Sequence, residues 1–125
     1  MKVSIAERRK AQRVPVDFGI KYRILRGKNI QKLEEQSYRI GIAKNMTQYG
    51  ICMSVPDPLE EGDVIHINFI INDREIDAFC SIIWSEKEPV GNMYEVGFEF
   101  DFLGHYDSLY LIQFMAEMFT KYGMI

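Results

Sequence analysis

Two short segments carry the side chains best suited to hold an anionic, aromatic small molecule. The first places Arg9 and Arg13 four residues apart in a basic stretch that also contains Arg8 and Lys10. A guanidinium group donates several hydrogen bonds in one plane, so it can hold phosphate oxygens, reach guanine O6 and N7, or lie flat on a base. Two such groups on one loop can do both jobs on a single ligand.

The second segment is Asn45–Gly50, which offers short polar side chains and a glycine. The Asn45 amide both donates and accepts, which suits the edge of a base. Thr47 offers a hydroxyl for a phosphate or for bracing a turn, and Gly50 permits a positive φ or the close approach of a ligand. Taken alone, the arginines also fit a solvated basic arm and the second segment an ordinary Asx turn. Only the fold decides whether the two segments meet.

The distribution of charge favours a local anion site over a broad nucleic-acid surface. Residues 1–28 carry nine lysines and arginines and two acids, a net charge of +7, whereas the whole chain of 125 residues has −3, so the remainder has −10. A protein that binds a nucleic-acid polymer is more often basic overall. We therefore expect a small anionic ligand and no nucleic-acid polymer.

Composition is typical of one globular domain, with 47% hydrophobic and 26% charged residues. No run of apolar residues is long enough to span a membrane, and no apolar segment follows the N-terminal charges as in a secretory signal. The cytoplasm is the expected location.

The remaining titratable residues do not suggest an enzyme or a metal site. Cys52 and Cys80 fall among apolar neighbours and are expected to be buried thiols. His66 and His105 are isolated, and we expect them on the surface or at a helix start. Too few cysteines and histidines are present, too widely scattered, for a metal site, and no catalytic grouping is readable. Three carboxylates on the last predicted strand are expected to face solvent: Glu95, Glu99 and Asp101.

Alternation of apolar and polar residues predicts six short strands, which favours an antiparallel barrel or sandwich closed on itself. Asn72 and Asp73 are expected to form a tight hairpin turn. On the fifth strand, Trp84 is expected to share one face with Ile76 and Ile82. The apolar positions that define the strands are Val14 to Ile24, Tyr38 to Ile42, Ile51 to Val55, Ile65 to Ile71, Ile76 to Trp84 and Tyr94 to Phe102.

A helix is predicted from about His105 to Tyr122, because this segment lacks glycine and proline and repeats apolar residues at helical spacing. Its apolar residues fall on two lines, wider than one packing surface requires. One line is expected to cover the barrel, and the other either packs deeper or meets a partner or a second copy. The first line is Leu109, Ile112, Met115, Ala116 and Phe119; the second is Leu111, Phe114, Met118 and Tyr122.

The two polar segments, taken in this order together with the strand pattern, resemble the signature of the PilZ domain family. Its signature is R-x-x-x-R before the first strand and [D/N]-x-S-x-x-G between the second and third, and here these stand as Arg9 to Arg13 and Asn45 to Gly50. The segment Tyr94 to Phe100 is similar to the family's last strand. The resemblance covers roughly residues 5–120.

The resemblance implies a mainly all-β fold, a six-stranded antiparallel β-barrel with a C-terminal α-helix. It implies a flexible basic arm, residues 1–13, followed by the barrel and helix, residues 14–125. It also implies that Arg9 and Arg13 hold the phosphates and guanines of cyclic di-GMP, with Arg8 and Lys10 assisting. Asn45 is then expected to read a guanine edge, while Thr47 supplies a hydroxyl and Gly50 shapes the turn.

Thr47 stands where the family usually has serine, and its extra methyl stiffens χ1, so weakened binding is expected. The function implied is a receptor that changes the conformation of its arm and signals in trans to a partner in flagellar, pilus or polysaccharide control. The alternative is an adaptor that no longer binds nucleotide and acts through its apolar helix, with a homodimer through that helix as a further possibility.

Overall fold

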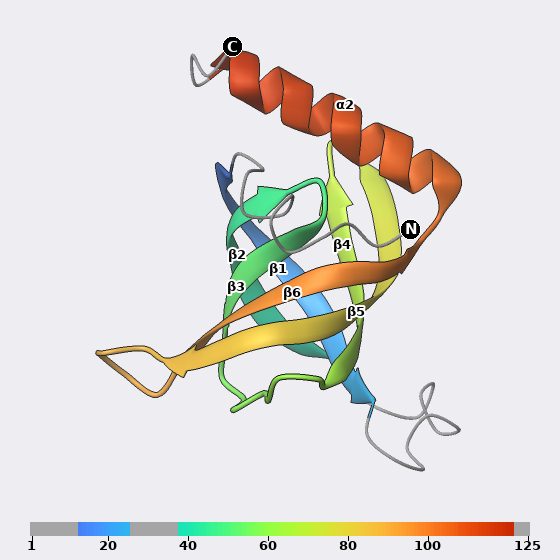
Figure 1. Cartoon of the computed structure of the whole chain (residues 1–125). Helices are drawn as coiled ribbons and strands as arrows, with labels where there is room; N and C mark the ends of the chain where they lie inside the picture. Colours follow the sequence, from blue (N-terminus) through green and yellow to red (C-terminus); the bar gives the residue numbers. More distant parts are fainter. Residues whose placement is uncertain (1–12, 26–37, 122–125) are drawn as a thin grey trace.

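The computed structural model describes residues 13–25 and 38–121. Within these ranges the strands form a closed barrel in which every neighbouring pair is antiparallel, in the order β1-β2-β3-β6-β5-β4, with β4 against β1 (Figure 1). The predicted fold is therefore confirmed. The elements are β1 (Val14–Leu25), β2 (Arg39–Thr47), β3 (Gly50–Val55), β4 (Val64–Ile71), β5 (Arg74–Lys87), β6 (Tyr94–Leu103) and α2 (His105–Lys121).

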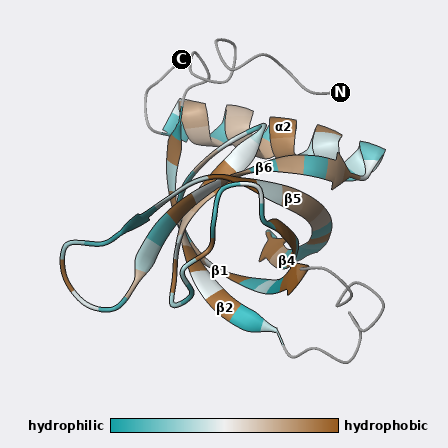
Figure 2. Cartoon of the chain, turned by 60° about the horizontal axis from the view of Figure 1, so that its bottom comes forward, coloured by the Kyte–Doolittle hydropathy of each residue, from teal (hydrophilic) through white to brown (hydrophobic). Residues whose placement is uncertain are grey.

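The core fills the inside of the barrel, because apolar residues alternate with polar ones along the strands (Figure 2). On β4, for example, Ile65, Ile67 and Phe69 are buried, while His66 and Asn68 face outward. Cys52 and Cys80 are buried and free, as predicted. Most of the buried residues form one cluster that joins all six strands and the helix.

Helix α2 lies across one end of the barrel (Figure 1). Leu111 and Met115 are buried in the core cluster, and the Tyr110 hydroxyl donates to the main-chain oxygen of Ile71 at 3.2 Å. The expectation was that one of the two predicted apolar lines covers the barrel. Instead each line contributes a buried residue, Met115 from the first line and Leu111 from the second. The outward side of the helix exposes Tyr106, Leu109 and Ile112. In the described part of the chain, no helix is both long and apolar enough to cross a membrane.

On β2 the residues that face the core are not the large apolar ones that the sequence pattern suggests. Ile40 and Ile42 are exposed, whereas Gly41 and Ala43 face the core. A Cβ added at Gly41 would lie 2.9 Å from both the Met53 sulfur and a Val55 methyl group, so β3 side chains occupy this space. The interior can therefore accept only small residues from this part of β2.

Irregular pairing at four places changes which residues face outward. On β5 the register shifts between Ile82 and Trp84, so Trp84 leaves the face of Ile82 and lies outside the barrel opposite Gly97. The expectation that Trp84 shares that inner face was wrong, because a single extra residue reverses the alternation. A second shift, between Phe79 and Cys80, leaves Asp101 of β6 as the extra residue and brings Phe79 opposite Phe102. Phe102 is therefore exposed and does not continue the apolar face of β6 that its alternation suggested.

The turn between β4 and β5 confirms the predicted hairpin. Asn72 and Asp73 both have positive φ, 48° and 67°, and Ile71 pairs with Arg74 across the turn. These angles belong to a type I′ turn, which matches the twist of the flanking strands. Helix α2 is tied to the same end of the barrel, since Arg74 donates to Asp107 Oδ1 at 2.8 Å and 3.1 Å.

Candidate ligand-binding site

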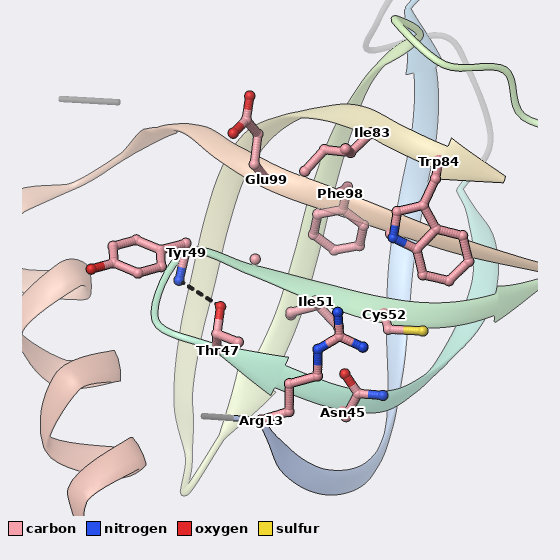
Figure 3. A pocket seen from close by; sticks show the side chains of 12 residues that line it. Arg13, Asn45, Thr47, Tyr49, Ile51, Cys52, Ile83, Trp84, Phe98 and Glu99 are labelled. Carbon is pink, nitrogen blue, oxygen red and sulfur yellow. Dashed lines mark hydrogen bonds between the residues drawn. The ribbon is translucent and has the colours of Figure 1, made fainter. Parts of the chain in front are cut away.

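The described members of the two polar segments line one pocket on the outside of the barrel. Arg13 immediately precedes β1, Asn45 and Thr47 are on β2, and Gly50 begins β3. The pocket is an open depression of about 100 Å³ (Figure 3). Arg8, Arg9 and Lys10 lie outside the described residues. The other residues that line the pocket are Tyr49, Ile51, Cys52, Ile83, Trp84, Gly97, Phe98 and Glu99.

Two glycines form the middle of the pocket, Gly50 on β3 and Gly97 on β6. Both strands run through the floor, with Gly50 opposite Glu99 and Cys52 opposite Gly97. The space beside each glycine is already filled, at Gly50 by the Phe98 main chain and at Gly97 by the Trp84 indole, so the two glycines let the floor of the pocket pack tightly.

Thr47 and Gly50 pair across a two-residue hairpin turn. The Thr47 hydroxyl accepts a hydrogen bond from the Tyr49 main-chain N–H at 3.1 Å (Figure 3). The Tyr49 main-chain oxygen accepts from the Phe100 N–H at 2.8 Å, which ties the turn to β6. The hydroxyl therefore braces the turn, one of the two roles expected for it.

Gly50 has a role that differs from the one the sequence suggests. Its φ is not positive, since within the described residues only Gly62 and Gly91 among the glycines have positive φ. A Cβ at Gly50 would lie 1.9 Å from the main-chain oxygen of Phe98. The glycine is required because β6 packs directly against it, and it does not shape the turn through its backbone angle.

Asn45 lies within β2 and not in the turn as expected. The register of β2 against β3 shifts between Ala43 and Asn45, so an irregularity at Lys44 precedes the site. Lys44 Nζ lies 3.4 Å from Glu95 Oε2 and 3.7 Å from Glu88 Oε1. A strand position holds the Asn45 amide more firmly than a loop does, because Asn45 itself pairs with Pro15 on β1 and with Cys52 on β3.

Trp84 is the main pocket residue that sequence reasoning missed. A Cβ at Gly97 would lie 2.2 Å from the indole Nε1, so the indole lies directly against the main chain of β6. The pocket thus has an aromatic side chain on one rim and the Arg13 guanidinium on the other (Figure 3). A glycine inside a predicted strand was the available signal, because it often marks such a close approach.

A family model described as PilZ domain matches residues 7–117. The chain belongs to the PilZ domain family. A search of curated protein sequences finds no significant match.

Solved structures similar to this PilZ domain share its fold at low sequence identity. The PilZ domain of YcgR from Escherichia coli, solved with c-di-GMP, has a TM-score of 0.64 and 12% identity, covering 91% of this chain and 93% of that one. The inhibitor of motility MotI/DgrA from Bacillus subtilis has a TM-score of 0.69 and 11% identity, covering 94% of this chain and 51% of that one. MrkH from K. pneumonia, in its apo state, has a TM-score of 0.68 and 13% identity, covering 99% of this chain and 55% of that one. This chain thus spans about half the length of MotI and MrkH.

The wall of the PilZ pocket contains a protonated thiol. Burial, together with a hydrogen bond from Cys52 Sγ to Glu95 Oε1 at 3.2 Å, raises the pKa of Cys52 to about 12. The thiol therefore donates to the carboxylate and is a poor nucleophile at neutral pH.

Carboxylates on β6 do not simply form a solvated face, as the sequence suggested. Glu95 accepts from Cys52 and Lys44, Glu99 lines the pocket, and Asp101 accepts a short hydrogen bond from the Ser81 hydroxyl. Among the described residues, no group of three or more His, Cys, Asp or Glu side chains is arranged to hold a metal ion.

Proposed function

We propose that this PilZ domain is a bacterial receptor that binds cyclic di-GMP in the pocket and has no catalytic activity. The observation that carries the proposal is that Arg13, from before β1, and Asn45 and Thr47, from β2, line the same pocket. Family membership supports it, as does the similar fold of the YcgR PilZ domain that was solved with c-di-GMP.

Each lining group matches a part of this ligand. The Arg13 guanidinium suits phosphate oxygens and the guanine O6/N7 edge. Asn45 can donate to and accept from a guanine edge. Arg9, which the R-x-x-x-R signature assigns, and the neighbouring Arg8 and Lys10 supply further cations to the two phosphates.

Trp84 suits the base itself. Its indole lies against the main chain at Gly97 and lines the pocket, so a flat purine can lie against it. The indole of Trp84 offers an aromatic face at the same point, and stacking of a base on such a ring contributes about 1–3 kcal/mol. An anionic and aromatic ligand therefore uses both rims of the pocket at once.

Arg13 is the last residue of the segment 1–13, so a ligand that binds Arg13 can act on this segment and thereby transmit a signal. A ligand held by Arg9, Arg13 and the barrel changes the conformation of this segment, at an entropic cost offset by the new contacts. The changed segment favours or blocks a partner protein in the cytoplasm, in motility, pilus or polysaccharide control. MotI, whose fold is similar, is described as an inhibitor of motility.

Isothermal titration with cyclic di-GMP tests the assignment. Arg13→Ala and Arg9→Ala are each expected to weaken binding roughly tenfold or more, because a hydrogen bond to a charged group is worth about 1.5–3 kcal/mol. Lys21→Ala, which removes one exposed charge from β1 outside the pocket, is the control and should bind as the wild type does. Wild-type affinity in both arginine variants would end the assignment.

One observation favours the alternative, an adaptor without nucleotide binding. Helix α2 exposes Tyr106, Leu109 and Ile112 on its outward side, a surface that a partner or a second copy can cover. The absence of any heat of binding with cyclic di-GMP, together with a complex or dimer lost in Leu109→Ser/Ile112→Ser, would select this function. The homodimer through the helix stays a prediction.

A further inference from the structure

A row of large side chains crosses the outer wall of the barrel away from the pocket residues. His66 on β4 pairs with Arg23 on one side and Phe79 on the other, and Phe79 pairs with Phe102. The His66 and Phe79 rings are 5.1 Å apart. None of these four residues lines the ligand pocket.

The aromatic end of this row is open to solvent. Phe79 is 37% exposed and Phe102 is 73% exposed, on neighbouring strands at opposing positions. Exposed aromatic side chains that lie side by side are enriched in protein interfaces, since burying them contributes much of the binding free energy. Two phenylalanines at this place therefore indicate a docking surface.

Two carboxylates lie beside the aromatic row. Asp77 accepts from His66 Nε2 at 2.9 Å and from Asn68 at 3.3 Å, and Glu75 accepts from the same Asn68 at 2.7 Å. Within the described ranges neither carboxylate forms an ion pair with a lysine or arginine, and the Asp77 side chain is 56% exposed. The part of this surface on β4 and β5 consequently carries two negative charges next to exposed aromatic rings, while Lys21 and Arg23 of β1 stand at its far edge opposite Asn68 and His66.

Elsewhere in this barrel, an arginine side chain contacts an aromatic ring and a carboxylate at the same time. Arg74 donates twice to Asp107 while its guanidinium lies 5.1 Å from the centre of the Tyr110 ring. Arg23 lies 3.8 Å from the centre of the Tyr38 ring at the other end of the row. A guanidinium satisfies an aromatic face and a carboxylate together, because it stacks with its plane and donates with its edge.

We propose that the acidic aromatic face, made of His66, Glu75, Asp77, Phe79 and Phe102, docks a partner protein through an arginine-bearing segment. A second copy of the same face is excluded as the occupant, since it brings like charges together. Nucleic acid is excluded for the same reason. The inference does not depend on nucleotide binding, because the face and the pocket share no residue.

The proposal is tested by titrating the full chain with two synthetic peptides. The two peptides are identical except that one has arginine where the other has lysine. Titration is followed by amide NMR signals and by fluorescence anisotropy of labelled peptide. We expect the arginine peptide to shift the signals of residues 66, 77, 79 and 102 and to bind at least threefold more tightly than the lysine peptide, because lysine cannot stack on the rings. The single variant Phe102→Ala and the double variant Glu75→Gln/Asp77→Asn should each weaken binding of the arginine peptide at least threefold.

Matched controls separate this face from general attraction to an acidic protein. Glu60→Gln/Glu61→Gln removes two exposed charges outside the face, and Ile40→Ala removes an exposed apolar side chain from β2. Both controls should bind the arginine peptide as the wild type does. Equal weakening by the two double variants, equal binding of the two peptides, or signal shifts confined to other residues would overturn the proposal.

Discussion

The ligand pocket and the acidic aromatic face are built partly on the outer sides of the same strands, β5 and β6, yet they present opposite chemistry. The pocket has glycines in its floor and Arg13 on its rim. The other face has no glycine, and Phe79, Phe102 and Asp77 project from it. A depression lined by a guanidinium group and an indole suits a flat anionic small molecule, whereas projecting rings and carboxylates suit a protein side chain.

The difference arises from irregular pairing between β5 and β6. The register shifts between Ile82 and Trp84, where Ile83 of β5 is the extra residue, and between Phe79 and Cys80, where Asp101 of β6 is the extra residue. Between these shifts Cys80 and Ile82 stay in the core. The shift on β5 turns Trp84 outward and the shift on β6 turns Phe102 outward, whereas Phe79 faces out through the ordinary alternation of β5.

The largest expected effect is at the floor of the pocket. Gly50→Ala should lower the free energy of unfolding by about 3 kcal/mol, because the new Cβ meets the Phe98 main chain, which cannot move without parting β3 from β6. Urea denaturation measures the change. Gly19→Ala is the control, since its Cβ lies 3.9 Å from an Ile40 side chain, and it should be neutral or stabilising by about 0.5 kcal/mol. Equal changes in the free energy of unfolding for Gly50→Ala and Gly19→Ala would contradict the close packing of β6 against Gly50.

Trp84→Ala should separate pocket binding from stability. Cyclic di-GMP affinity is expected to fall roughly tenfold through loss of stacking, while binding of the arginine peptide to the other face is unchanged. Trp84→Phe should keep part of the affinity. The chain has a single tryptophan, so its fluorescence in the wild type should also change on titration with the nucleotide. Unchanged affinity in Trp84→Ala would remove the indole from the site.

Alkaline pH should destabilise the fold through the thiol in the pocket wall. Burial and Glu95 raise the pKa of Cys52 from 9.0 to about 12, so the folded state keeps its proton where the unfolded state loses it. The stabilisation is complete below pH 9 and is lost as the pH rises from 9 to 12. Burial also raises the pKa of Cys80 and Tyr22, which adds to the loss. Melting temperatures at pH 8 and pH 10.5 should fall less in Cys52→Ala than in the wild type; equal falls would contradict this.

The smallest expected effect concerns the methyl group of Thr47. Thr47→Ser keeps the hydroxyl that accepts from the Tyr49 N–H and frees χ1, so cyclic di-GMP should bind roughly threefold more tightly. Thr47→Val keeps the shape but leaves that N–H without its partner, and it should bind more weakly than the wild type. Titration calorimetry measures both, and weaker binding by the serine variant would refute the reasoning.

Local patterns predicted the parts of the fold that depend on local physics. Alternation identified the strands, the Asn72–Asp73 pair identified a turn that needs positive φ, and helical spacing placed the start of α2 at His105. These features follow from side-chain type and backbone preference within a few neighbouring residues. That Arg13, Asn45, Thr47 and Gly50 share a pocket was expected only from the resemblance to the PilZ family, because residue types alone do not bring distant segments together.

Pairing between distant strands decided the rest. Trp84 faces the pocket because β5 shifts its register against β6, and Ile40 and Ile42 face solvent because β3 side chains fill the space inside Gly41. Gly50 is needed where β6 packs against β3, and nothing near it in the sequence reveals that contact. Sequence by itself determined the alternation and the chemistry available to this PilZ domain. Tertiary structure alone decided where that alternation breaks and which residues then face out, because one inserted residue reverses a period of two.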